Sequence, residues 1–76
     1  MEKLNLVKNT FDQLPNNIEA EQAVLGSILV SNDIFDDVSP IINSNNFFDP
    51  MHQKIYIAIE KLIFSGMLAN PITLKN

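Results

Sequence analysis

The stretch FFDPMHQKIYIAIEKLIFSGM, residues 47–67, limits what this 76-residue chain can fold into more than any other stretch. Asp49 is a good helix N-cap, and Pro50 suits the first helical position because its missing N–H would be unpaired there anyway. Gly66 suits the left-handed residue that ends a helix. Between them, apolar residues recur at helical spacing: Ile55, Ile59, Leu62 and Ile63. The stretch therefore predicts one amphipathic helix.

An earlier helix is predicted to begin at Asn16 or Asn17, either of which can cap it, and to run to about Val30. With Asn16 as the cap, Glu19 falls at the third helical position, which is a capping-box arrangement with Asn in place of Ser or Thr. Glu19 and Glu21 also lie in the first turns, where the helix dipole favours negative charge. We interpret both acids as serving the helix start. Residues two apart on a helix point in different directions, so the two are not a catalytic carboxylate pair.

The apolar face of this earlier helix is predicted to carry one polar residue, Gln22, beside Leu25. A buried glutamine needs hydrogen-bond partners, so Gln22 is expected to bond a loop backbone in a structural role. Gly26 lies at the flank of the same face. A glycine in a helix interior costs about 1 kcal/mol relative to alanine, so we expect another helix to approach closely there.

Prolines shape the rest of the chain. Pro40 interrupts an apolar pattern over residues 33–43, and that segment is expected to be kinked or split there. The NSNN run at 43–46 is typical of a loop. Near the end, Pro71 and Thr73 resemble the lead-in and cap of a further helix, of which only three residues follow.

The expected fold is all-α: a small orthogonal helical bundle of about three helices plus the start of a fourth. Residues 1–14 have no strong period and are predicted to be a mobile N-terminal arm, and residues 15–76 are predicted to form the helical domain. The chain has no cysteine, so neither a disulfide nor a Cys-ligated zinc can stabilise it.

Charge and hydropathy exclude several classes of function. The net charge is −4, and the five cations are scattered lysines with no arginine, so direct binding of nucleic acid or of an anionic membrane surface is not expected. No apolar run approaches the ~20 residues of a membrane span. The first residues do not resemble a secretory signal. These features favour a cytoplasmic location.

No catalytic, nucleotide-binding or metal-binding set is predicted. The two glycines, Gly26 and Gly66, do not form a phosphate-binding loop followed by Lys and Ser or Thr. His52 is the residue closest to acid–base chemistry. It has no second ligand or marked nucleophile near it in sequence, and it lies in line with Ile55 and Tyr56. A hydrogen-bonded structural histidine is therefore favoured.

The paired aromatics Phe47 and Phe48 allow two interpretations. Aromatic side chains can stack on the bases of single-stranded nucleic acid, but such platforms are accompanied by cations. The nearest charges here are Asp49 and, further along, Lys54. Core packing is therefore favoured, with one of the two rings packed onto the following helix.

Four blocks, LPNNIEAEQAVLGSIL, FDDV, NNFFDPMHQKIYIAI and PITL, occur in an order and spacing that resembles the N-terminal domain of bacterial replicative DNA helicases, the DnaB family. The resemblance runs from about Leu14 to Leu74. The motif residues that carry it are interpreted as structural: Glu19, Glu21, Gln22, Leu25, Gly26, Phe47, Phe48, His52, Ile55 and Tyr56.

The resemblance implies a helical head that contacts the primase and neighbouring helicase subunits in a hexameric ring. ATP and magnesium would belong to a separate motor domain, which is not in this chain. The family's head continues through further helices and a helical hairpin. The MLANP turn, residues 67–71, is longer and more apolar than the family's usual turn. In the family this head forms a collar with its neighbours. That assembly, and with it an oligomer, is expected only where the hairpin is present.

Three hypotheses follow from this resemblance. The leading one is a fragment or shortened product of the replicative helicase that acts through protein contacts in primosome assembly. The second is a free-standing helical interaction module. The third is that the sequence belongs to a complete helicase, in which case the enzyme class belongs to the rest of that protein. A non-functional product of a truncated gene is a further alternative. No partner-contact residue is assigned on this basis.

Overall fold

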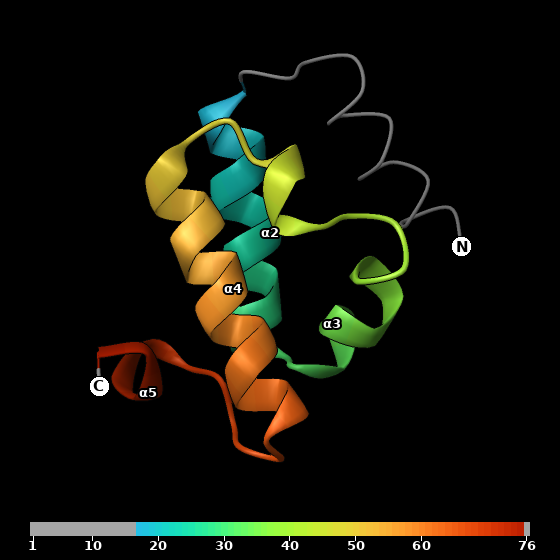
Figure 1. Ribbon diagram of the computed structural model, residues 1–76, viewed down its shortest axis with the longest axis vertical. Coiled ribbons are helices and arrows are strands. Elements are labelled where there is room, and N and C mark those ends of the chain that lie inside the picture. Colours follow the sequence, from blue (N-terminus) through green and yellow to red (C-terminus); the bar gives the residue numbers. More distant parts are fainter. Residues whose placement is uncertain (1–16, 76) are drawn as a thin grey trace.

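The computed structural model describes residues 17–75, and the secondary structure in this range is helical throughout (Figure 1). No strand occurs among these residues, so the predicted all-α class is confirmed. The arm predicted at residues 1–14 lies outside the described range. The elements are α2 (Ile18–Val30), α3 (Asp33–Val38), the 3₁₀-helix η1 (Ser44–Asn46), α4 (Pro50–Phe64) and α5 (Pro71–Lys75).

Helix α2 begins at the second of the two predicted caps. The Asn17 side chain accepts a hydrogen bond from the Ala20 backbone N–H at 2.9 Å. Ala20, and not Glu19, therefore occupies the third helical position. The predicted capping box between Asn16 and Glu19 was wrong by one residue.

Both ends of α4 form as predicted. The Asp49 carboxylate accepts from the Met51 N–H at 2.8 Å, and Pro50 takes the first helical position. At the other end Gly66 has φ 79°, which glycine adopts without strain. The Met67 N–H donates to Leu62 O at 2.9 Å and the Gly66 N–H donates to Ile63 O at 3.0 Å. These two bonds form a Schellman motif.

The segment between α2 and α4 is split at its proline, as predicted. Helix α3 ends at Val38, and Pro40 follows in a turn. The NSNN run, predicted to be a loop, contains the single 3₁₀ turn η1. Asn43 and Asn46 cap that turn reciprocally, because the side chain of each accepts a hydrogen bond from backbone at the other end.

The last predicted helix exists, but its cap is Asn70 and not Thr73. The Asn70 side chain accepts from the N–H groups of Ile72 and Thr73, both at 2.9 Å. In return, the Thr73 hydroxyl oxygen accepts from the Asn70 N–H at 2.9 Å. This reciprocal cap helps to hold a five-residue helix that would be too short to persist alone.

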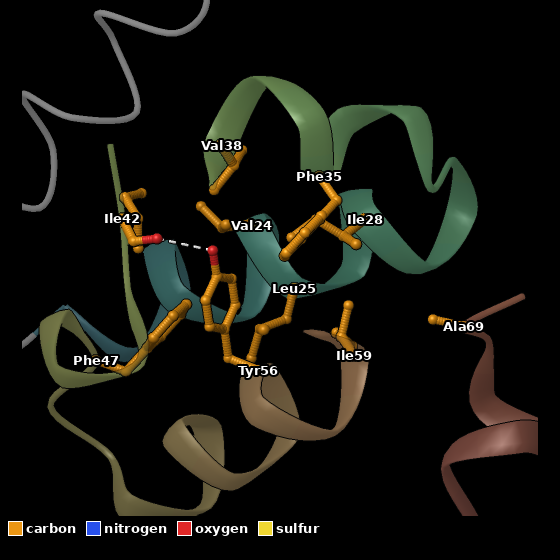
Figure 2. Close-up of a cluster of buried hydrophobic side chains, with 10 residues drawn as sticks. All are labelled: Val24, Leu25, Ile28, Phe35, Val38, Ile42, Phe47, Tyr56, Ile59 and Ala69. Atoms are coloured by element: carbon orange, nitrogen blue, oxygen red, sulfur yellow. Dashed lines mark hydrogen bonds between the residues drawn. The ribbon is translucent and has the colours of Figure 1, made fainter. Parts of the chain in front are cut away.

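The core lies between α2, α3 and α4 and is centred on Tyr56 (Figure 2). Tyr56 is fully buried, and its hydroxyl donates to the backbone oxygen of Ile42 at 2.8 Å. Its ring packs against the rings of Phe47 and Phe35, with centroids 5.1 and 5.8 Å away. The buried hydrophobic residues are Val24, Leu25, Ile28, Phe35, Val38, Ile42, Phe47, Tyr56, Ile59 and Ala69.

One side chain ties the turn before α5 to the end of α2. The Asn32 amide group donates to Ile28 O at 2.8 Å and to Ala69 O at 2.9 Å, and the Asn32 side-chain oxygen accepts from the Ala69 N–H at 2.8 Å. Ala69 is fully buried. Asn32 thus positions the segment from which α5 starts. None of the helices described is long and apolar enough to cross a membrane.

Candidate functional site at the α2–α4 junction

A buried carboxylate joins α2 to the start of α4. Glu21 is only 1% exposed. One of its oxygens, Oε2, accepts from the Phe48 N–H at 2.7 Å, and the other, Oε1, accepts from the Asp49 N–H at 3.3 Å. Oε1 also lies 2.8 Å from Nδ1 of His52. The carboxylate therefore meets three hydrogen-bonding groups in the first turn of α4 and just before it.

The position of Glu21 follows from the needs of a helix start. The first N–H groups of a helix have no partner within the helix, and the positive end of the helix dipole favours an anion there. Asp49, the N-cap residue of α4, accepts from one such group, the N–H of Met51. Glu21, which lies on α2, accepts from the N–H groups of Phe48 and Asp49 just before α4. The turn is held from a third side by Gln53, whose side-chain amide donates to Phe47 O at 2.7 Å.

The hydrogen bond to Glu21 fixes how His52 presents its ring. An ionised carboxylate can only accept, so Nδ1 of His52 must carry the proton that is donated to Glu21. The neutral ring then has its lone pair on Nε2. His52 is 7% exposed and belongs to the wall of a groove, and within residues 17–75 no hydrogen bond to Nε2 occurs.

The groove beside His52 is open and mostly apolar, with a volume of about 500 Å³. Its walls come from α2, α4 and α5. Polar groups are few and are supplied by Gln22, His52 and Lys75. The lining residues are Gln22, Leu25, Gly26, Leu29, His52, Ile55, Pro71, Leu74 and Lys75.

Burial also sets the pKa of Tyr56, the single tyrosine of the chain. Burial, and secondarily the charge of Glu60, raises the pKa of Tyr56 from 10.0 to about 12. The Tyr56 hydroxyl therefore stays neutral and donates its hydrogen bond over the whole physiological range. The ring of Phe47 lies edge-on to His52, with centroids 6.4 Å apart, so the aromatic core directly abuts the Glu21–His52 pair.

Several predicted site residues lie where the sequence pattern indicated. Leu25, Phe47 and Tyr56 are buried in the core. Of the two paired aromatics, Phe47 packs inward and Phe48 is 58% exposed. The hydrogen bond predicted for His52 is present. Ile55 is half-buried on the groove wall, and Glu19 is exposed at the start of α2.

Three predicted environments were wrong. Gln22 is exposed at the groove and is not a buried residue on the apolar face. Glu21, interpreted as an acid serving its own helix start, is buried and serves the start of α4. Gly26 is exposed, and a Cβ built on it would meet no described atom within 4 Å, so no described helix approaches it closely.

One signal in the sequence could have identified Glu21. The buried positions of α2 are Glu21, Val24, Leu25 and Ile28, which is the i, i+3, i+4, i+7 spacing of a single helix face. An acid on that face requires a buried partner. Nothing in the periodicity indicates that the partner is His52, which lies 31 residues away.

Among the described residues, the hydrogen bonds of the Glu21–His52 pair join α2 to α4. Within the described part of the chain, no three His, Cys, Asp or Glu residues gather in a way that could hold a metal ion. A carboxylate–histidine pair can polarise a nucleophile, but the residues that share the groove with His52 include no serine, threonine or cysteine.

Comparison with known proteins decides the family. The sequence model of the family described as DnaB-like helicase N terminal domain matches residues 13–76 of this chain. This chain belongs to that family. The DnaB-like match thus covers α2, α3, α4 and α5 together with the Glu21–His52 junction, so all the geometry described above lies within the domain.

The similar full-length proteins are named Replicative DNA helicase DnaB. The protein from Rickettsia typhi is 44% identical over 79 residues, covering 96% of this chain and 16% of its own length. The protein from Rickettsia felis is 51% identical over 63 residues, covering 83% and 13%. The protein from Mycobacterium leprae is 41% identical over 61 residues, covering 80% and 10%. No solved structure gave a significant match.

Proposed function

We propose that this chain is a protein-contact module of DNA replication, which contributes to primosome assembly by binding primase and neighbouring helicase subunits. The observation that carries the proposal is the DnaB-like match over residues 13–76. The chain spans 16% of the Rickettsia typhi relative's length, so a helicase's activity is a property of a much longer protein.

The surface of the domain supports a contact role. The groove beside His52 is lined mainly by apolar side chains. Among residues 17–75, eight large hydrophobic residues are exposed, and Val30, Phe64 and Ile72 expose 90%, 76% and 73% of their surfaces. Apolar surface of this kind gains free energy when another protein covers it. The buried hydrogen bonds between Glu21 and the start of α4 hold α2 and α4, which carry part of this apolar surface, in one arrangement.

We assign ATP hydrolysis and its magnesium ion to other parts of a full-length helicase. The sequence has no phosphate-binding loop and no arginine to stabilise a transferred phosphoryl group. The purified 76-residue chain is expected to hydrolyse no ATP above the background of a mock purification. ATPase activity that follows the folded chain through purification would overturn this assignment.

Direct binding tests the proposal. The chain is immobilised, and the primase and the complete helicase of the source organism are passed over it in biolayer interferometry. Saturable binding of both is expected. The Ile59→Asp variant should lose binding, because this fully buried residue cannot become charged without unfolding the domain.

The matched control is Asn45→Asp, which places the same charge at an exposed polar site outside the groove and the exposed apolar residues. Its far-ultraviolet circular dichroism should equal that of the wild type. If the wild-type chain is helical and binds neither protein, the proposed function is wrong. If Ile59→Asp binds as well as the wild type, binding does not depend on the fold, and the proposal also fails.

A further inference from the structure

The part of the chain that follows α4 has little buried surface. Residues 67–75 leave α4 at Gly66 and include the short helix α5 (Figure 1). Of these residues only Ala69 is buried, and Leu74 is half-buried against the core. Three others are large hydrophobic residues that are exposed: Met67, Leu68 and Ile72. We call residues 67–75 the 67–75 segment.

A single side chain, that of Asn32, holds the buried residue of this segment. Its oxygen accepts from the Ala69 N–H at 2.8 Å, and its amide group donates to Ala69 O at 2.9 Å. A further bond, from the Met67 N–H to Leu62 O at 2.9 Å, joins the segment to the end of α4. Because Ala69 is fully buried, both of its backbone groups would lack a partner in the closed fold without Asn32.

Within the segment, hydrogen bonds connect the buried residue to α5. The Thr73 hydroxyl oxygen accepts from the Asn70 N–H at 2.9 Å, and the Leu74 N–H donates to Asn70 O at 3.0 Å. Asn70, which caps α5, directly follows Ala69, so the buried anchor and the cap are adjacent. A five-residue helix is too short to persist alone, so α5 should unfold when Ala69 is released.

Gly66 provides a point at which the segment can turn away from α4. It has φ 79°, and a Cβ built on it would meet no described atom within 4 Å, so the backbone has open space around it. Glycine moves between backbone conformations with the least steric restriction. Hinges in proteins are commonly a few residues of this kind at the ends of helices and strands.

The segment forms one wall of the apolar groove between α2, α4 and α5. That wall consists of Pro71, Leu74 and Lys75, and the other walls belong to α2 and α4. Leu29 of α2 and Ile55 of α4 are half-buried there. Removal of the segment would therefore increase the apolar surface of α2 and α4 that faces solvent.

We propose that the 67–75 segment opens and closes as one unit while the rest of the domain stays folded. Gly66 is the hinge, and Asn32 is the positioning residue that sets how often the segment opens. In the open state α5 is unfolded and the groove surface of α2 and α4 faces solvent. Such cooperative units, less stable than the whole fold, are a common property of proteins. This conformational device goes beyond the proposed function and does not depend on it.

Native-state amide hydrogen exchange of the full chain, followed by NMR, tests the inference. The amides of Met67, Ala69 and Leu74 report on the segment, because each donates a hydrogen bond that opening breaks. All three are expected to exchange with one common free energy of opening. Added urea should lower it, because opening exposes surface, but less steeply than it lowers the value for Ile59 in the buried middle of α4.

Two variants act on different parts of the closed state. Asn32→Ala removes the side chain that holds Ala69, and Thr73→Val removes the hydroxyl that helps to cap α5. Each variant should speed exchange of all three amides by one common factor, at least about ten-fold for Asn32→Ala. Met67 is the decisive reporter, because neither variant removes its own bond to Leu62 O. Asn45→Ala, at an exposed site in η1, is the control and should change none of them.

Three results would overturn the inference. Unchanged exchange at Met67 in Asn32→Ala would show that the segment does not open as a unit. A response to Thr73→Val at Leu74 alone would show that α5 unfolds by itself. A urea dependence equal to that of Ile59 would show that the segment opens only in global unfolding. These measurements need no partner, so their outcome is distinguishable from that of the primase and helicase binding test.

Discussion

The two ends of α4 are fastened in different ways. At its start, the buried Glu21 carboxylate accepts from two backbone N–H groups and pairs with His52. At its end, a Schellman motif at Gly66 uses only backbone, and the neutral side chain of Asn32 holds the following turn at Ala69. One end depends on a buried charge and the other on neutral hydrogen bonds.

The two ends of α4 should differ in how much stability is lost when their side-chain contacts are removed. A buried charge is tolerated only while all its partners are in place, and the loss of one partner leaves an expensive orphan. Neutral hydrogen bonds to a peripheral turn fail locally and at smaller cost. The start of α4 adjoins the aromatic core through Phe47, so a failure there should spread to the whole fold. A failure at the end should stay near α5.

Removal of the buried carboxylate should have the largest effect. Glu21→Ala leaves His52 and two backbone N–H groups without their acceptor, at about 3–5 kcal/mol of unfolding free energy. A domain of this size has roughly 0.05–0.15 kcal/mol of stability per residue, so the variant should be largely unfolded. Thermal unfolding by circular dichroism measures this, with the exposed Glu19→Ala as control. A loss below about 1 kcal/mol would contradict the importance given to the junction.

Alkaline pH should destabilise the core that both ends share. The folded-state pKa of Tyr56 is raised to about 12 from 10.0 by burial, so the folded chain holds its proton more tightly than the unfolded chain. The resulting stability is complete below pH ~10 and is lost as the pH rises towards ~12, by roughly 1–3 kcal/mol. Urea unfolding at a series of pH values measures it. Tyr56→Phe should remove this part of the pH dependence, and an unchanged slope would refute the assignment.

Loss of the neutral fastening should have a smaller and local effect. Asn32→Ala leaves the buried Ala69 N–H unpaired, at about 1–3 kcal/mol. Amide hydrogen exchange should speed up at Ala69 and through α5, with α2 and the start of α4 unchanged. Asn45→Ala, at an exposed site, is the control. Uniform loss of protection across the chain would show that the two ends are not energetically separate.

The two glycines should respond in opposite directions. Gly26 lies in the interior of α2 with open space around it, so Gly26→Ala should stabilise the chain by about 0.5–1 kcal/mol. Gly66 has φ 79°, so Gly66→Ala should cost about 1–2 kcal/mol at the end of α4. Chemical denaturation of both variants compares them. A destabilising Gly26→Ala would mean that the space beside Gly26 is filled in the folded chain.

The helices of this chain could be predicted from residues close together in the sequence. The hydrogen bonds between polar side chains far apart in the sequence could not. Asp49, Pro50 and Gly66 marked the ends of α4 because caps act within a few residues. On α2 the apolar residues are spread around the helix, so the buried face could be misplaced by one residue. Gln22 was therefore predicted to be buried in place of Glu21. The contacts from Glu21 to His52 and from Asn32 to Ala69 span 31 and 37 residues. Such contacts depend on tertiary packing, which periodicity does not encode.

The most direct test of the Glu21–His52 junction is the tautomer of the single histidine. A long-range ¹H–¹⁵N correlation spectrum of the folded chain separates the two ring nitrogens of His52. The structure predicts a proton on Nδ1, donated to Glu21, and an unprotonated Nε2. A ring that carries its proton on Nε2, or that exchanges between both forms as a free histidine does, would contradict the account.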